Sequence, residues 1–183
     1  SKMTTADLAA YRAKDRPPIC GTYRAYRICG MGPPSAGGIS VLMILKQLER
    51  FDMAALGRTS PVAWHLFAES SRLAYADRGM YIADPDFVDV PVAGLLAPAY
   101  LAQRSALIAP DRSLASVEPG KPAGAPPRTR APFKDDPGTS DLAVVDGAGN
   151  VVQVTTTGVR MSIARDARYM AKESIEDIMC CFE

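Results

Sequence analysis

Two runs of β-branched and apolar residues, 139–146 and 150–157, flank the tripeptide 147–149, Gly-Ala-Gly. Glycines between two such runs are typical of a β-hairpin with a short loop. A three-residue loop places Thr139 opposite Thr157, whereas a four-residue loop would place Gly158 there. Directly opposed residues of antiparallel strands have Cβ atoms roughly 4.5–5.5 Å apart, so the two threonine hydroxyls could form a hydrogen bond in the first register. Strand propensity alone also explains threonines in a hairpin, so these residues do not by themselves indicate catalysis.

The remaining periodic segments predict helices and a second pair of strands. Apolar residues recur at helical spacing from about 38 to 50, and Ser60 followed by Pro61 is a good start for a longer helix that runs to Gly79. Shorter helices are expected from Thr4 or Thr5 and over 99–107, and a strand or hairpin over 18–31. The longer helix should bury one face, formed by Ala63, Leu66, Phe67, Ser70, Leu73, Ala74 and Asp77.

Residues 118–138 are crowded with proline and glycine and have almost nothing to bury. This composition predicts an extended, exposed and mobile linker. A proline-rich ligand for an aromatic groove, within 119–132, is the alternative interpretation.

Charge and cysteine content limit the classes of function. The 183 residues carry a formal net charge of +1 at pH 7, which provides no long-range field for a polyanion and argues against nucleic acid as a partner. No stretch approaches the roughly 20 apolar residues of a membrane span, and no signal peptide is recognised. The four cysteines lack C-x-x-C spacing, and no metal or other cofactor is expected. We expect Cys20 and Cys29 to be buried free thiols, with a disulfide across the hairpin between them as the alternative.

Several polar residues invite a functional reading but have simpler explanations. His65 is the only histidine and lies in the polar part of a helix, so a surface or packing role is favoured over a Ser-His-Asp system. Glu69, Asp77 and Arg78 on the same helix are most simply solvated or salt-bridged. The pair 37–38, Gly-Gly, lacks the spacing of a phosphate loop and is interpreted as a turn rather than an anion site.

The motifs "MTTADLAAY", "PPSAGG", "LERFDM", "AYADRGMYIADPDFVDVP", "PGTS" and "GTSDLAVVDGAGNVVQVTTT" follow one another in the order found in gamma-glutamyltranspeptidases. The chain resembles the end of the large subunit and the start of the small subunit of this family of N-terminal-nucleophile hydrolases, over residues 3 to about 157. The resemblance implies an α/β fold, as part of a four-layer αββα sandwich. It also implies two regions: 1–138, which includes a linker at 119–138, and 139–183, which diverges after 157.

The resemblance further implies autocleavage between Gly138 and Thr139, which makes Thr139 the N-terminal nucleophile, with Thr157 as its hydrogen-bond partner. An N-terminal α-amine has a pKa of about 7.7–8.0, which suits it to activate the hydroxyl near neutrality. The implied substrates are γ-glutamyl compounds of the glutathione type, with water or an amine as acceptor. The implied partners are the large and small subunits of one precursor, and the implied location is periplasmic or extracellular.

The chain also departs from the family pattern. Asp141 stands where the family usually has His, and a carboxylate there would raise the pKa of the Thr139 amine. If Phe182 marks a later family motif, Cys181 replaces the Asp that holds the substrate amino group. The glycine-serine oxyanion segment and the arginine for the substrate carboxylate are not found either, so we expect a fragment or a divergent copy. The alternatives to an enzyme are an inactive homologue and an interaction module.

Overall fold

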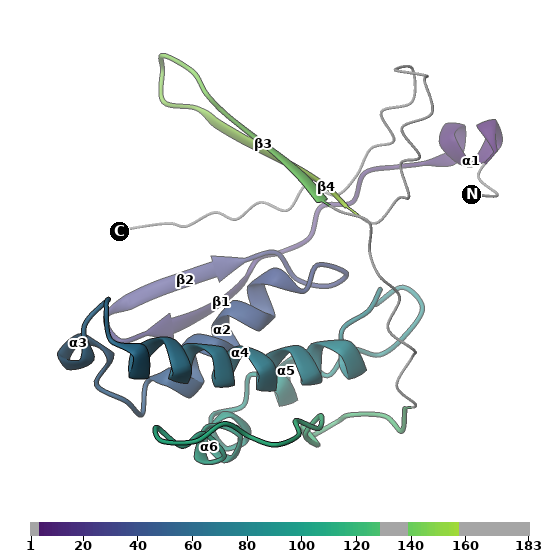
Figure 1. The fold of residues 1–183 in the computed structure, drawn as a ribbon. Coiled ribbons are helices and arrows are strands. Elements are labelled where there is room, and N and C mark those ends of the chain that lie inside the picture. Colours follow the sequence, from purple (N-terminus) through teal and green to yellow (C-terminus); the bar gives the residue numbers. More distant parts are fainter. Residues whose placement is uncertain (1–3, 129–138, 158–183) are drawn as a thin grey trace, which may run out of the picture.

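The computed structural model describes residues 4–128 and 139–157. Figure 1 shows a helical body with one β-hairpin packed on it and a second hairpin after it in the chain. Both hairpins are antiparallel and each forms its own two-stranded sheet, so the described part mixes helix and strand as the predicted α/β class requires. The elements are α1 (Thr5–Ala10), β1 (Ile19–Tyr23), β2 (Tyr26–Gly30), α2 (Gly37–Leu48), α3 (Met53–Leu56), α4 (Pro61–Tyr81), α5 (Val92–Leu95), α6 (Pro98–Ala106), β3 (Thr139–Val145) and β4 (Val151–Thr157).

Helix α2 lies at the centre of the body, between the β1–β2 hairpin and helices α4 and α6 (Figure 1). Its apolar residues recur every three or four positions, so one face enters the core. Its first turn packs directly on β2: a Cβ atom on Gly30 would lie 2.6 Å from the Cα atom of Gly38. Gly30 and Gly38 therefore permit a close contact between strand and helix. The interpretation of the pair 37–38 as a turn is wrong, because both residues lie in the first turn of α2. The buried core consists of Ile39, Met43, Ile44, Leu48, Leu66, Leu73, Ala74, Tyr81, Leu95, Tyr100, Leu101 and Ile108.

The capping residues set the helix starts as the sequence predicts. Thr4 caps α1 by accepting a hydrogen bond from the backbone N–H of Asp7, and Ser60 caps α4 in the same way through Ala63. The predicted burial of Phe67 on α4 is wrong, because this residue is 44% exposed. It lies off the buried stripe and packs edge-to-face against Trp64, with ring centroids 6.1 Å apart.

The two N-terminal cysteines form a disulfide, so the expectation of free thiols is wrong. The register of β1 and β2 places Cys20 directly opposite Cys29, with Cα atoms 4.1 Å apart. Sequence alone could not fix this register, because the residues between the cysteines allow more than one turn. The hairpin itself, predicted over 18–31, is confirmed.

Residues 119–128 pack against the helical body, which corrects the expectation of an exposed linker for this part. The backbone N–H of Gly120 donates to Asp77 Oδ1 at 2.7 Å, and the Tyr81 hydroxyl donates to the Gly120 carbonyl at 2.6 Å. Pro122 is buried, and a Cβ atom on Gly94 would lie 2.0 Å from the Ala123 carbonyl oxygen. Residues 129–138, the rest of the predicted linker, lie outside the described residues.

Asp77 is the centre of this packing. It is fully buried, accepts a hydrogen bond from the Tyr100 hydroxyl at 2.8 Å, and lies 3.1 Å from Arg104 Nε in an ion pair that is not aligned as a hydrogen bond. Burial raises the pKa of Asp77, and the Gly120 N–H and Arg104 act against that increase without cancelling it. Burial likewise raises the pKa of Tyr100 above its usual range.

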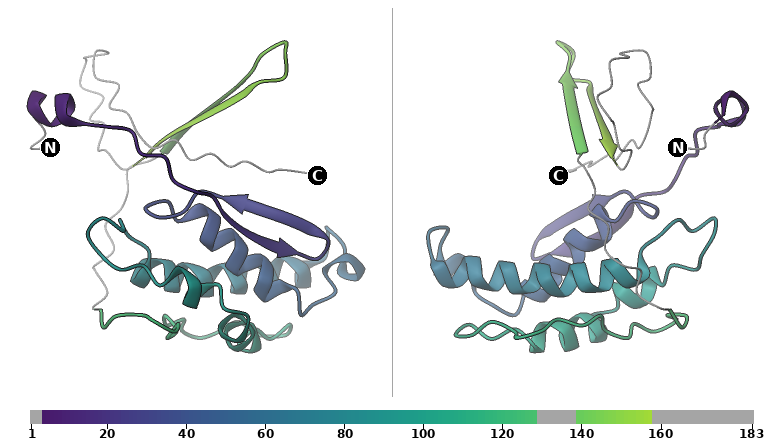
Figure 2. Two further views of the ribbon diagram at one scale, coloured as in Figure 1. Left: turned by 180° about the vertical axis from the view of Figure 1, so that it is seen from behind. Right: turned by 45° about the vertical axis from the view of Figure 1, so that its right-hand side comes forward.

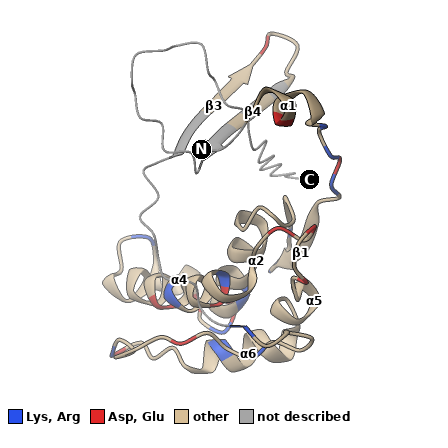
Figure 3. Cartoon of the chain, turned by 90° about the vertical axis from the view of Figure 1, so that its right-hand side faces the viewer, with Lys and Arg blue, Asp and Glu red and all other residues tan. Residues whose placement is uncertain are grey.

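The second hairpin, β3–β4, is drawn away from the helices in the views of Figure 2. Its strands have their extensive contacts with each other. Basic and acidic residues occur along several elements rather than on one face (Figure 3), in line with the net charge of +1.

Candidate active site

The register of β3 and β4 confirms the predicted pairing of the two threonines. Thr139 is the first residue of β3 and Thr157 is the last residue of β4, and they are directly opposed partners. The next pairs are Ser140 with Thr156 and Asp141 with Thr155. The structure therefore pairs Thr139 with Thr157, the two residues that the sequence analysis predicted for the site.

The turn explains why this register forms. The backbone N–H of Asp146 donates to the Asn150 carbonyl at 3.0 Å, which closes a three-residue loop and excludes the four-residue alternative. Asp146 Oδ1 accepts the backbone N–H groups of Ala148 and Asn150, each at 2.9 Å, and Gly149 adopts a φ of 84° that favours glycine. The Asn150 side-chain amide, with these backbone donors, lowers the pKa of Asp146.

Asp141 shares a strand face with the first threonine. Residues i and i+2 of a strand lie on the same side, so Thr139 and Asp141 occupy one face together with their partners Thr157 and Thr155. Gly138, the other residue of the expected cleavage bond, lies outside the described residues.

The hairpin exposes several apolar side chains. Leu142, Val144 and Val152 share one face and are more than half exposed, and Val145, on the other face, is 66% exposed. Hairpins of two strands are marginal without a packed face. The described contacts therefore leave these apolar side chains of the hairpin uncovered.

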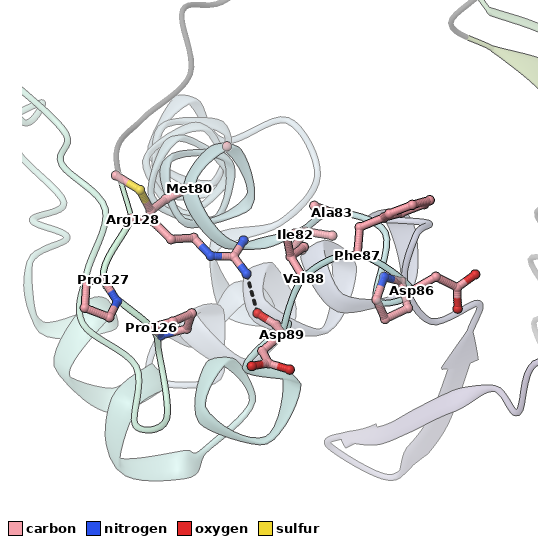
Figure 4. A pocket seen from close by; sticks show the side chains of 12 residues that line it. Met80, Ile82, Ala83, Asp86, Phe87, Val88, Asp89, Pro126, Pro127 and Arg128 are labelled. Carbon is pink, nitrogen blue, oxygen red and sulfur yellow. Dashed lines mark hydrogen bonds between the residues drawn. The ribbon is translucent and has the colours of Figure 1, made fainter.

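A separate hollow of about 790 Å³ lies between the loop after α4 and residues 126–128. Figure 4 shows Arg128 reaching across it to the Asp89 carbonyl, to which its Nη2 donates; Nη1 donates to the Tyr81 carbonyl at 3.3 Å. Phe87 on its rim is 84% exposed. None of the expected site residues lines this hollow, whose arginine instead ties residues 126–128 to the body.

The polar residues of α4 have structural roles. His65 Nε2 lies 2.9 Å from the Ala109 carbonyl, which confirms a packing role. Glu69 and Asp77 are almost completely buried and both are ion-paired, which confirms the salt-bridged alternative over the solvated one. Arg78 is exposed and lies over the ring of Tyr75. Sequence reasoning placed Asp77 on the buried face of the helix but could not identify its partners, because one of them is a backbone N–H 43 residues away.

Within 4–128 and 139–157, no group of three or more His, Cys, Asp or Glu side chains is arranged to hold a metal ion. In the same part of the chain, no helix combines the length and hydropathy that crossing a membrane requires.

Comparison with known proteins gives these observations a family. The family model described as gamma-glutamyltranspeptidase matches residues 1–161, which include the whole β3–β4 hairpin. The chain belongs to the gamma-glutamyltranspeptidase family. The glutathione hydrolase proenzyme of Escherichia coli (strain K12) is 43% identical to it over 157 residues, which cover 85% of this chain and 26% of that protein. The acylase ACY 1 proenzyme of Pseudomonas sp. (strain V22) is 42% identical over 155 residues, 83% of this chain and 25% of that protein.

Solved structures of the same family agree with the fold. The crystal structure of Helicobacter pylori gamma-glutamyltranspeptidase superposes with a TM-score of 0.62 and 42% sequence identity, covering 65% of this chain and 35% of that one. The resemblance inferred from the sequence motifs is therefore confirmed. The chain spans about a quarter of the length of the curated relatives it matches.

Proposed function

We propose that the protein to which this chain belongs transfers or hydrolyses γ-glutamyl groups, with Thr139 as an N-terminal nucleophile released by autocleavage after Gly138. The observation that carries the proposal is the pairing of Thr139 with Thr157 in a hairpin that lies wholly within the family match. In this role the Thr139 hydroxyl attacks the γ-glutamyl carbonyl, and its own α-amine accepts the hydroxyl proton. Water or an acceptor amine then releases the acyl group.

Thr157 has a supporting role in this proposal. Its register opposite Thr139 puts a second hydroxyl-bearing residue at the nucleophile, where it can accept or donate a hydrogen bond and orient the attacking oxygen. Such orientation matters because correct placement of reacting groups accounts for a large part of many catalytic rates.

The four-layer αββα sandwich is proposed as the setting of the hairpin. Apolar side chains on both faces of β3–β4 support it, because a strand pair inside stacked sheets needs cover on each side. Large and small parts of one precursor would then form the site together, and two relatives named as proenzymes support such processing. A periplasmic or extracellular location is proposed as well; the Cys20–Cys29 disulfide suits an oxidising compartment.

Acylase activity on other amides is a second candidate. The observation in its favour is the Pseudomonas acylase ACY 1 proenzyme, which is almost as similar to this chain as the E. coli glutathione hydrolase proenzyme is. An N-terminal threonine serves either reaction, since both begin with attack on an amide carbonyl. An interaction module based on 119–132 is less well supported, because residues 119–128 are tied to the body by Asp77, Tyr81 and Arg128.

Self-cleavage tests the proposal. Intact-mass measurement of the purified chain over time should show conversion into two pieces separated at Gly138–Thr139, and Thr139→Ala should abolish the conversion. The Ser140→Ala variant is the matched control, because it removes a neighbouring hydroxyl from the opposite strand face. This variant should still be cleaved. A wild-type chain that stays whole, or a cut elsewhere, contradicts the proposal and favours the inactive homologue.

A further inference from the structure

The strands of the hairpin carry a single ionisable side chain. Residues 139–145 and 151–157 contain threonine, serine, alanine, leucine, valine and glutamine, and Asp141 is their one charged residue. Asp146 lies beyond the end of β3, in the turn, five residues further along the chain. In the described part of the chain, the extensive contacts of β3 and β4 are with each other. Asp141 is therefore the one ionisable side chain that the two strands themselves place near Thr139.

The position of Asp141 relative to Thr139 is set by the strand. At about 3.4 Å per residue, the Cα atoms of residues 139 and 141 are about 7 Å apart, and both residues lie on the face that also includes Thr155 and Thr157. Neither threonine can neutralise a carboxylate. A negative charge at this distance favours a positive charge on the backbone nitrogen that cleavage would expose at Thr139.

We propose that Asp141 holds the released α-amine of Thr139 in its protonated form at neutral pH. The amine can then act as a base only at alkaline pH. The inference rests on the proposed function for its catalytic meaning, but the charge interaction itself requires only that Thr139 be a free N-terminus. Asp141 acts by stabilising the proton on the amine and does not itself contact the substrate. It is therefore a positioning residue.

The size of the effect follows from the distance. A unit charge about 7 Å away raises the pKa of an amine by roughly half a unit in a fully aqueous setting and by roughly one and a half units at the effective dielectric of a protein surface. An ordinary α-amine has a pKa of about 7.7–8.0, so an increase of one unit lowers the neutral fraction at pH 7 about tenfold. The acid limb of any activity that depends on the amine should move to higher pH by the same amount.

The experiment measures the amine directly. Residues 135–138 are replaced with Ile-Glu-Gly-Arg, so that a protease specific for that sequence exposes Thr139 whether or not the chain cleaves itself. The rate at which acetic anhydride acylates the Thr139 amine is followed from pH 6 to pH 10 by peptide mass mapping. Asp141→Asn should lower the midpoint by half a unit or more, and Asp141→Glu should keep it near the wild-type value.

A charge-matched control separates distance from net charge. The double variant Asp141→Asn with Ala143→Asp keeps the acid on the same face but moves it to about 14 Å, beyond the screening length of about 8 Å at physiological ionic strength. Its midpoint should match that of Asp141→Asn alone. Equal midpoints for wild type and Asp141→Asn, or a midpoint restored by the acid at 143, overturn the inference. Self-cleavage of the unaltered chain is scored separately, so its failure would refute the proposed function without deciding the role of Asp141.

Discussion

At the scale of single residues, the strand register determines the pairing of the two threonines. Thr139 and Thr157 are opposed because the loop at 147–149 has three residues, and Asp146 fixes that loop through two backbone N–H groups. A loop one residue longer or shorter would shift the register by one and place Thr157 on the strand face opposite to that of Thr139. The turn therefore sets the pairing of the two threonines of the proposed site from the far end of the hairpin.

Loss of the Thr157 hydroxyl should slow self-cleavage without preventing it. Thr157→Val keeps the shape of the side chain and removes one hydrogen-bonding group, which is worth about 1 kcal/mol, or about fivefold in rate. The measurement is the fraction of cut chain against time by intact mass. Thr156→Val is the control, because residue 156 pairs with Ser140 on the opposite face and should leave the rate unchanged. Equal rates for both variants would show that Thr157 does not assist Thr139.

At the scale of elements, the sequence predicted what depends on neighbours along the chain. The caps at Thr4 and Ser60, the helical periodicity of α2 and the β3–β4 turn are all local signals, and each is confirmed. The disulfide and the packing of residues 119–128 depend on partners far along the chain. Gly120 is held by Asp77 through a backbone N–H, which every residue except proline has, so no composition marks it.

Glu69 joins α4 to a distant loop and should make stability depend on pH. Its Oε2 accepts the Leu114 N–H at 2.8 Å and its Oε1 accepts Arg72 Nη1 at 2.6 Å. Burial alone would raise the pKa of Glu69, but these donors outweigh it and lower the pKa below its usual value. Because the folded pKa is the lower one, the stabilisation is present above the unfolded pKa of about 4.3 and disappears as pH falls through the folded value.

Glu69→Gln should therefore lower the free energy of unfolding by about 1–3 kcal/mol at pH 7 and by much less at pH 3. Urea unfolding of both chains at the two pH values measures this difference. Glu118→Gln is the control: that side chain is exposed, and the residue contributes its carbonyl to Arg104, which the substitution preserves. A loss of stability that is equal at pH 3 and pH 7 would mean that the Glu69 charge is not the stabilising group.

At the scale of the whole molecule, the helical body and the β3–β4 hairpin differ in how fully their apolar side chains are buried. The body has a continuous core across α2, α4, α5 and α6, together with a buried ion pair. The β3–β4 hairpin carries the proposed nucleophile but leaves large apolar side chains uncovered. The family match extends over both parts, while the chain spans about a quarter of its curated relatives. The proposed nucleophile thus lies on the part that depends most on further packing.

The 183-residue chain alone should release no aniline from a chromogenic γ-glutamyl anilide above background, even after cleavage at Thr139. Holding substrate in a reactive orientation is worth roughly 7–11 kcal/mol of barrier, and one oxyanion donor roughly 10²–10³ in turnover. The hairpin supplies the proposed nucleophile and its partner, and the extensive contacts of β3 are with β4, so no other described element has extensive contacts with the strand that carries Thr139. The assay compares the cleaved chain with Thr139→Ala. Release that disappears in this variant would contradict the prediction and would assign substrate contacts to residues outside the described ones.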